Sequence, residues 1–231
     1  MKLNYPKAVL FDHDGVLVSS EEIHARAWSM LIKELGLPWD KIQMHKLVGR
    51  TSPQIMAMIL DEFKPGWTTH DYNLDALALR KNDFYLDIAS SELAAYPGVR
   101  EGLEWLKSKG IKTAVVSNAK KRELSFSIER LKLTSLLDVI VSRDDAAHPK
   151  PHPAPYQLGA ALLGLDPNQC LAIDDTPTGL ESAFLAGCQC ASVTTNYEAH
   201  HLKKPVPGRD DFVTQWVGDS MVDFFNWLQN K

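Results

Sequence analysis

The chain has 231 residues, of which 45% are apolar, and it carries a formal net charge of −4. This composition is ample for one or two buried cores, and the mixed charges exclude a basic nucleic-acid footprint and a polybasic membrane patch. No apolar run approaches the roughly 18 residues that a membrane helix requires, and the N-terminal "MKLNYPKAVLFDHDG" lacks the features of a signal peptide. We therefore expect neither a nucleic acid nor a membrane as a partner. The composition does not indicate an oligomeric state.

Short apolar runs alternate with helical patterns along most of the chain. The runs typical of buried parallel strands are Ala8–Phe11, Thr113–Val116, Leu137–Val141, Leu171–Ile173 and, more weakly, Cys190–Val193. The helical patterns are Val99–Lys109, Leu124–Leu131, Tyr156–Leu163 and Gly179–Ala186, and the C-terminal "WVGDSMVDFFNWL" predicts a final core-packing helix. This alternation predicts an α/β fold built on a doubly wound, Rossmann-like parallel sheet.

The alternation stops between residues 18 and 92. This stretch has no good strand candidate, and its amphipathic patterns predict the helices Glu21–Leu35, Gln54–Phe63 and Tyr72–Ile88. Ligands of open α/β sheets bind at the carboxyl ends of the strands, and a helical block inserted after the first strand is most simply a lid over that edge. We therefore expect a split core domain, residues 1–17 and 93–231, with an inserted all-α cap domain, residues 18–92.

Polar side chains follow the strong predicted strands. In chain order the set is Asp12 and Asp14, Ser117 and Asn118, Lys150, then Asp174 and Asp175. The sheet topology would bring these side chains together at one edge. Several carboxylates beside one lysine favour a hard cation with oxygen ligands, Mg²⁺, and Mg²⁺ usually brings a phosphate with it.

The spacing of the first two aspartates suits phosphoryl transfer. Positions i and i+2 lie on one face of an extended backbone, so Asp12 can accept a phosphoryl group as an aspartyl-phosphate. Asp14 can then protonate the leaving oxygen and later deprotonate the attacking water. Lys150 would neutralise the transferring oxygens, Ser117 would donate a hydrogen bond to one of them, and Gly15 would allow the sharp turn.

Each of these motifs is weak by itself. Acidic residues commonly cap helices after strands, so Asp174-Asp175 alone could be a capping pair, and Ser117-Asn118 alone is a turn or cap in most proteins. It is the ordered set at successive strand ends that indicates a phosphoryl-transfer site.

The ordered set resembles the four motifs of the haloacid dehalogenase (HAD) superfamily of phosphotransferases, here "FDHDGVL", "VVSN", "KPHPAPY" and "AIDDTPTG". The resemblance runs from about residue 7 to residue 193, and the helical insert resembles a type I cap. It implies that Mg²⁺ is bound by Asp12, by the backbone carbonyl of Asp14, and by Asp174 and Asp175. The family often has glutamate at the first acid of the fourth motif. The shorter Asp174 leaves open whether it binds the metal directly or through water.

Within the superfamily the chain resembles the group of β-phosphoglucomutase and related sugar phosphatases. "EEIHARAW" resembles a segment whose histidine helps to hold the acid/base aspartate, which places His24, and "RKNDFY" resembles a cap segment whose lysine reaches the substrate, which places Lys81. Where the mutases have an arginine for the distal phosphate, "VGRTSPQ" has Ser52, with Arg50 two positions earlier. The chain also has "SNAKK" where the mutases prefer Ser-x-Ser-Lys. Both departures favour hydrolysis. We predict that the substrate is bound by His24, Arg50, Lys81 and Asn118.

The sequence therefore predicts a Mg²⁺-dependent phosphatase of small phosphorylated metabolites, with sugar phosphates as the expected substrates. The alternative is a β-phosphoglucomutase-like phosphohexomutase, an isomerase that uses the same aspartyl-phosphate. A dehalogenase is disfavoured because its motif lacks the second aspartate, here Asp14. A non-catalytic interaction protein is disfavoured because every catalytic motif position is filled.

The three cysteines, Cys170, Cys188 and Cys190, lie in or beside apolar runs and are odd in number. They predict buried free thiols and hence a reducing compartment, so the expected location is the cytoplasm.

Overall fold

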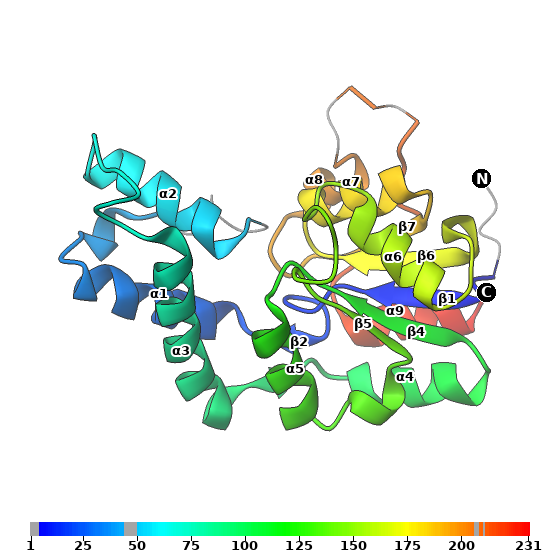
Figure 1. The fold of residues 1–231 in the computed structure, drawn as a ribbon. Helices are drawn as coiled ribbons and strands as arrows, with labels where there is room; N and C mark the ends of the chain where they lie inside the picture. The colour runs from blue at the N-terminus through cyan, green and yellow to red at the C-terminus, as the bar shows by residue number, and fades with distance from the viewer. Residues whose placement is uncertain (1–4, 44–49, 206–207, 210) are drawn as a thin grey trace. The chain divides into compact units, whose positions relative to one another are not determined.

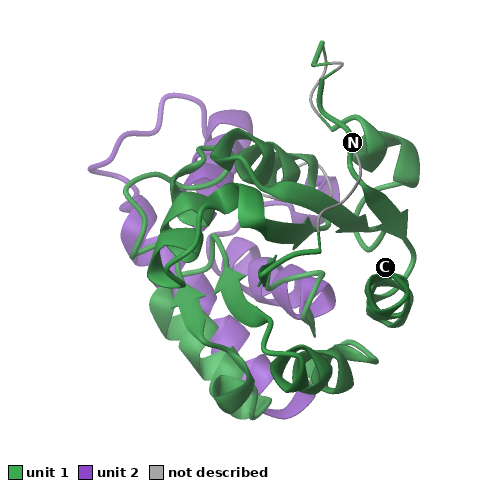
Figure 2. Cartoon of the chain, turned by 90° about the vertical axis from the view of Figure 1, so that its right-hand side faces the viewer, with its two compact units in different colours: residues 1–19, 94–231 green, residues 20–93 purple. Residues whose placement is uncertain are grey.

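The computed structural model describes residues 5–43, 50–205, 208–209 and 211–231 (Figure 1). The chain divides into two compact units, which Figure 2 shows in different colours. Unit 1 comprises residues 1–19 and 94–231, and unit 2 comprises residues 20–93. Each unit has a hydrophobic core of its own.

Unit 1 is built on a parallel sheet of six strands in the order β5-β4-β1-β6-β7-β8. The strands are β1 (Ala8–Phe11), β4 (Lys112–Val116), β5 (Val139–Val141), β6 (Cys170–Asp174), β7 (Gln189–Val193) and β8 (Trp216–Gly218). The first strand lies inside the sheet and the chain winds outwards from it in both directions, so the predicted doubly wound sheet is confirmed. The short antiparallel pair β2 (Val18–Ser19) and β3 (Ala94–Ala95) forms a separate sheet.

Helices cover both faces of this sheet. Against one face pack α6 (Ala154–Leu162) and α7 (Pro177–Ala186), and on the other side of the sheet lie α4 (Val99–Ser108) and α9 (Met221–Gln229) (Figure 1). Unit 1 also contains α5 (Lys121–Arg130), α8 (Ala199–Lys203) and the 3₁₀ helices η3 (Thr134–Leu136) and η4 (Pro167–Gln169).

The central strand shows why its apolar run folds this way. Every residue of β1 is fully buried, as expected for a strand covered on both faces. Successive side chains point to opposite faces: Leu10 belongs to the core cluster that contains Tyr156 of α6. The ring of Phe11 contacts α9, with its centroid 6.4 Å from Phe224 and 6.2 Å from Phe225.

The C-terminal segment corrects one prediction. The stretch that begins at Trp216 does not form a helix from its start, because Trp216–Gly218 adds β8 to the sheet beside β7, and α9 begins only at Met221. Ser220 explains the late start, since its hydroxyl accepts a hydrogen bond from the N–H of Asp223 and so caps the helix. The predicted strand at Leu137 also begins two residues later, at Val139.

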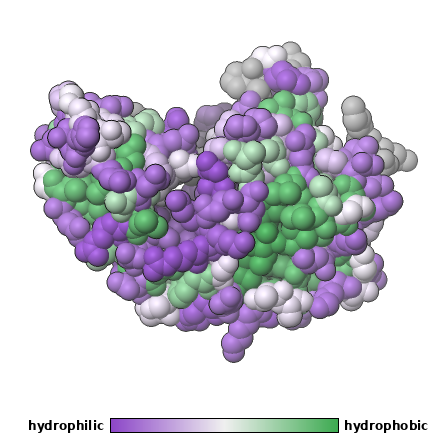
Figure 3. All heavy atoms as spheres, viewed as in Figure 1, coloured by the Kyte–Doolittle hydropathy of each residue, from purple (hydrophilic) through white to green (hydrophobic). Residues whose placement is uncertain are grey.

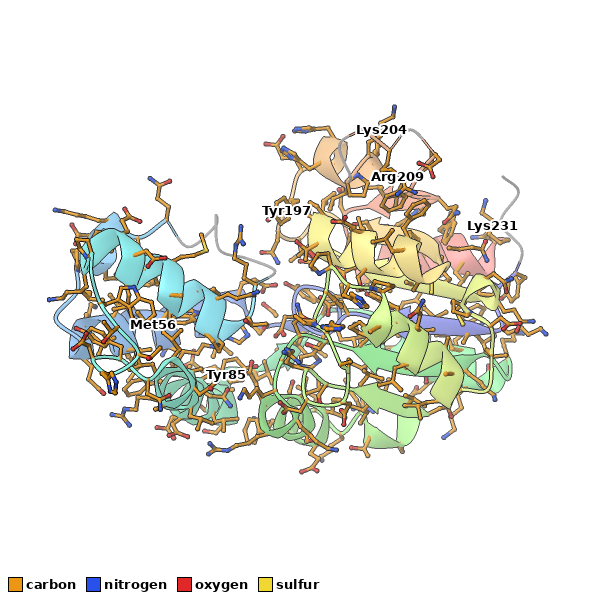
Figure 4. All side chains as sticks on the ribbon, turned by 45° about the horizontal axis from the view of Figure 1, so that its top comes forward. Met56, Tyr85, Tyr197, Lys204, Arg209 and Lys231 are labelled. Carbon is orange, nitrogen blue, oxygen red and sulfur yellow. The ribbon has the colours of Figure 1, made fainter. Side chains whose placement is uncertain are left out.

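The elements described in unit 2, whose residues 44–49 lie outside the description, are all helices: α1 (Glu21–Glu34), the 3₁₀ helix η1 (Trp39–Lys41), α2 (Ser52–Phe63) and α3 (Leu74–Glu92). The apolar faces of α1 and α2 form its core around Trp28, Leu31 and Met56, the last of which is labelled in Figure 4. The helix starts have the expected capping residues: Thr51 and Gln54 form a capping box before α2, and Asn73 accepts the N–H of Ala76 before α3.

Most of the surface seen in Figure 3 is hydrophilic, with an apolar area on unit 1 near α6, where Leu162 is 58% exposed. No helix in the described part of the chain is long and apolar enough to cross a membrane. Cys170, Cys188 and Cys190 are buried free thiols, as predicted.

Candidate active site

The carboxyl ends of three neighbouring strands carry most of the predicted site residues. Asp12 follows β1, Ser117 follows β4, and Asp174 is the last residue of β6. Since β4, β1 and β6 are adjacent and parallel, these ends lie at one edge of the sheet (Figure 1). This is the edge at which open α/β sheets bind their ligands.

Lys150 joins two of these strand ends. Its Nζ lies 2.9 Å from Asp12 Oδ1 and 2.8 Å from Asp174 Oδ2, and only 4% of its side chain is exposed. A third contact, 3.2 Å long, goes to the hydroxyl of Tyr156. Burial alone would lower the pKa of the Lys150 ammonium, but the charges of Asp12 and Asp174 raise it to about 12. Lys150 is therefore a permanent positive charge with all three of its N–H donors engaged.

Three carboxylates lie together at this edge of the sheet, beside the single positive charge of Lys150. Asp12, Asp174 and Asp175 each offer an oxygen within 4.8 Å of the others, and Asp174 and Asp175 are fully buried. Burial, followed by the charge of Asp174, raises the pKa of Asp12 to about 7. One lysine does not balance three clustered carboxylates, so the donor set fits a further cation. Oxygen-only donors are those that Mg²⁺ prefers.

The bonding of Asp174 bears on whether it would touch a metal directly. Its Oδ1 accepts from the N–H and the hydroxyl of Thr176, at 3.0 and 2.8 Å. Its Oδ2 accepts from Lys150 and, at 2.9 Å, from Tyr156. Both oxygens are thus occupied by protein donors, which favours indirect contact with a cation over direct ligation.

The start of α7 packs tightly on the same carboxylate. A Cβ added at Gly179 would lie 1.8 Å from Asp174 Oδ2, so no side chain fits there. Thr176 caps this helix by accepting the N–H of Gly179. The motif "DDTPTG" therefore uses its Thr and Gly to hold its first aspartate in place.

Ser117 and Asn118 take different positions in the site. The hydroxyl oxygen of Ser117 accepts the N–H of Ala119 at 3.0 Å and keeps a proton that it can donate. Asn118 Oδ1 accepts the backbone N–H of Lys150 at 3.0 Å, and its amide donates to the Lys150 carbonyl at 3.4 Å. Asn118 therefore fixes the loop that carries Lys150, and substrate contact by Asn118 remains a prediction.

Asp14 lies in unit 1, just after β1, where it forms an isolated bridge with Val18. The predicted substrate-binding residues His24, Arg50 and Lys81 lie in unit 2. His24 on α1 and Lys81 on α3 are brought together, with 2.6 Å between His24 Nδ1 and Lys81 Nζ. The His24 ring stacks on Tyr85, labelled in Figure 4, with 4.4 Å between centroids. Lys81 is 2% exposed, although lysine is rarely buried. Arg50 is exposed and precedes α2, next to residues 44–49, which lie outside the described residues.

Sequence reasoning missed several residues that support the carboxylates. Tyr156 stands in the quoted "KPHPAPY" but was not singled out, and its buried hydroxyl contacts both Lys150 and Asp174. Burial, followed by the charge of Asp174, holds the pKa of Tyr156 well above its usual value, so the hydroxyl stays protonated and donates. Asn196, in the loop after β7, donates to Asp175. Asn196 lies just beyond the end of a strand, as several of the predicted site residues do. Its strand is the weakest of the predicted strands, and only residues that follow the stronger strands were predicted to belong to the site.

A parallel sheet whose carboxyl edge carries a group of three aspartates and a lysine is the arrangement of an α/β enzyme. Residues 9–193 match the haloacid dehalogenase-like hydrolase family, and the chain belongs to that family.

Similar proteins agree with this assignment. Phosphoglycolate phosphatase of Pseudomonas putida is 30% identical over 196 residues, which are 83% of this chain and 71% of that protein. Phosphorylated carbohydrates phosphatase of Thermotoga maritima is 28% identical over 183 residues, 79% of this chain and 82% of that protein. The crystal structure of β-phosphoglucomutase from Clostridium difficile has a TM-score of 0.80 at 23% identity, and the match covers 97% of this chain and 96% of that one. At 23% identity, the similarity to the β-phosphoglucomutase structure shows that the two proteins share a fold.

Proposed function

We propose that this chain is a Mg²⁺-dependent phosphatase of small phosphorylated metabolites, with sugar phosphates as the expected substrates, acting through an aspartyl-phosphate. The observation that carries the proposal is the buried group of Asp12, Lys150 and Asp174, with Asp175 beside it, at the carboxyl edge of the sheet. The similar proteins named as phosphatases of phosphoglycolate and of phosphorylated carbohydrates support the substrate class.

The mechanism assigns one role to each polar group. An Asp12 oxygen attacks phosphorus and forms the acyl-phosphate bond while the bond to the substrate oxygen breaks, and Asp14 gives that oxygen its proton. Water then attacks the same phosphorus, Asp14 takes the water's proton, and Asp12 and inorganic phosphate are released. Lys150 and Ser117 stabilise the charge on the phosphoryl oxygens throughout.

Mg²⁺ would be held by Asp12, the Asp14 carbonyl and Asp175, with Asp174 acting through water. When bound, it would neutralise charge on the phosphoryl group and on the clustered carboxylates. Unit 2 would serve as the cap, with His24, Arg50 and Lys81 contacting the substrate, and the cytoplasm would be the compartment suited to the buried thiols.

The second candidate function is a phosphohexomutase. It is favoured by the contact between His24 and Lys81, because both residues lie in segments that resemble those of the mutases. The two functions differ only in whether water or a second substrate hydroxyl accepts the phosphoryl group.

A screen of phosphorylated metabolites with Mg²⁺, read for both phosphate release and isomerisation, tests the proposal. Hydrolysis of one or more small phosphate monoesters with stoichiometric phosphate is expected. A hexose 1-phosphate isomerised in the presence of its bisphosphate, without stoichiometric phosphate, would select the mutase. Turnover of neither kind would contradict both functions.

Activity is expected to depend on Mg²⁺ and to disappear in excess chelator. Because the donors are all oxygens, Mn²⁺ should substitute, whereas Ca²⁺ should bind and inhibit since its larger, looser shell does not keep the in-line geometry. Initial rates in a metal titration measure this. Full activity in chelator would contradict the metal assignment.

His24→Ala separates the two functions further. In a phosphatase, whose acceptor is water, the change should cost roughly tenfold in kcat/KM, about 1.4 kcal/mol. In a mutase it should raise phosphate release at the expense of isomerised product, because the restraint on Asp14 would be lost. Lys81→Ala, the matched variant at the other end of the contact, should raise KM in both cases. We expect His24→Ala to show the roughly tenfold loss in kcat/KM that a phosphatase would show. A shift from isomerisation to hydrolysis in this variant would show that the chain is a mutase.

A further inference from the structure

The end of β7 and the loop that follows it make three hydrogen bonds to the candidate site, and none of the motifs accounts for them. Ser192, near the end of β7, donates its hydroxyl to the Asp174 carbonyl at 2.6 Å, since the register pairs these two residues. Beyond the strand, Thr195 donates to the Gly15 carbonyl at 2.7 Å, and the amide of Asn196 donates to Asp175 Oδ2 at 2.5 Å. In Figure 4, the labelled Tyr197 marks this loop.

These hydrogen bonds reach two separate parts of the site, the turn after β1 and the loop after β6. Gly15 belongs to the turn that carries Asp12 and Asp14, whereas Asp175 belongs to the loop after β6. The two parts lie far apart in the chain and meet only through the fold. The loop after β7 therefore ties the turn of the proposed nucleophile to the proposed metal ligand.

The contact between Asn196 and Asp175 also lies directly against Gly15. A Cβ at Gly15 would be 2.1 Å from Asp175 Oδ2 and 2.9 Å from Asn196 Nδ2. Gly15 also has a φ of +77°, which other residues rarely adopt. The absence of a side chain at Gly15 thus serves the packing of this pair as well as the turn.

We propose that Asn196 is a positioning residue of the magnesium site, whose amide holds the Asp175 carboxylate in the orientation that binds the cation. The inference rests on the proposed function, because it assumes that Asp175 is a ligand. The physical reason is general: partners that hydrogen-bond a metal-binding carboxylate fix its rotamer, and their loss typically costs about 10- to 100-fold in metal affinity. Asn196 itself need not touch either metal or substrate.

The test measures Mg²⁺ binding without substrate, by calorimetric titration of metal-stripped protein. Asn196→Leu keeps the size of the side chain but removes the amide that donates to Asp175, and the Kd for Mg²⁺ should rise by about tenfold or more. Asn196→Ala leaves space in which water can replace the donor, so a smaller rise is expected. The matched control is Thr194→Val, on the same loop, because the Thr194 hydroxyl donates to Asp219 rather than to the site. Its Kd should stay within about twofold of wild type.

Turnover gives a second readout. For Asn196→Leu the Mg²⁺ concentration needed for half-maximal rate should rise, while kcat and the substrate KM at saturating Mg²⁺ should stay close to wild type. The melting temperature in chelator should match that of Thr194→Val, which shows that folding is intact.

Three results would overturn the inference. The first is that Asn196→Leu binds Mg²⁺ as tightly as Thr194→Val does. The second is that Asn196→Leu raises the substrate KM at saturating Mg²⁺ while the Kd for Mg²⁺ is unchanged, because Asn196 would then be a substrate contact. If wild-type protein itself binds no Mg²⁺, the metal assignment of the proposed function fails, and the role of Asn196 fails with it.

Discussion

Asp12→Asn is expected to abolish turnover while leaving the metal-free protein at least as stable as wild type. Turnover should fall by at least about 10³-fold, because nothing else in the site can carry the phosphoryl group and loss of a nucleophile can cost about 10⁶-fold elsewhere. Stability should not fall, because the pKa of Asp12 is raised to about 7 by burial and by Asp174, so its charge is unfavourable in the folded protein. Steady-state kinetics and urea unfolding in chelator measure the two effects.

The matched control is Asp138→Asn. Asp138 accepts the N–H of Thr113 at 2.8 Å, where β4 has just begun, at the opposite edge of the sheet from the site. This variant should keep its turnover and lose some stability, the reverse of Asp12→Asn. A fluoride mimic of the phosphoryl group should bind wild type and not Asp12→Asn. Substantial residual turnover in Asp12→Asn would overturn the covalent mechanism.

The sequence was sufficient to predict the centre of the fold. Ala8–Phe11 is apolar without interruption, and a run of that kind followed by acids indicates a strand buried on both faces. The same reasoning predicted that Asp12, Lys150 and Asp174 would meet, because their strands or loops end at one sheet edge. The structure adds what patterns do not contain, namely that Lys150 lies between the two carboxylates with every donor used.

The edge of the fold was harder to predict. Trp216–Gly218 is a half-buried strand of three residues. A run of three residues is too short for the apolar and polar positions to show whether it forms a strand or the start of a helix. It becomes a strand because β7 offers it hydrogen-bonding partners, which is a tertiary effect.

Supporting residues were missed for a related reason. Tyr156 and Asn196 act through contacts to residues distant in sequence, and the type of residue alone does not reveal its partner. Tyr156 has the apolar ring of an ordinary core residue, and only its hydroxyl, aimed at Asp174, sets it apart. His24 and Lys81 were found through resemblance; their contact needs α1 and α3 to pack side by side, which helical periodicity does not specify.

Lys150→Met is expected to damage both the fold and the chemistry. Methionine keeps the length of the side chain but removes the only positive charge that contacts Asp12 and Asp174 in the described structure. Removing one partner of a buried ion pair leaves an uncompensated charge and typically costs about 3–5 kcal/mol, so the free energy of unfolding should fall by that order. Turnover should fall by about 10²–10³-fold, the usual cost of losing one group that stabilises charge in the transition state.

Chemical unfolding with and without Mg²⁺ separates this effect from ordinary loss of packing. Because a cation would supply the charge that the variant lacks, Mg²⁺ should stabilise Lys150→Met more than it stabilises wild type. The matched control is Lys112→Met, since Lys112 Nζ donates to the Leu163 carbonyl at 2.6 Å and contacts no carboxylate at the site. That variant should change stability by less than about 1 kcal/mol, as expected for loss of one ordinary hydrogen bond, and should not alter the response to Mg²⁺. If the two lysine variants unfold alike and respond equally to Mg²⁺, then Lys150 does not balance the buried carboxylates, and the electrostatic account of this site is wrong.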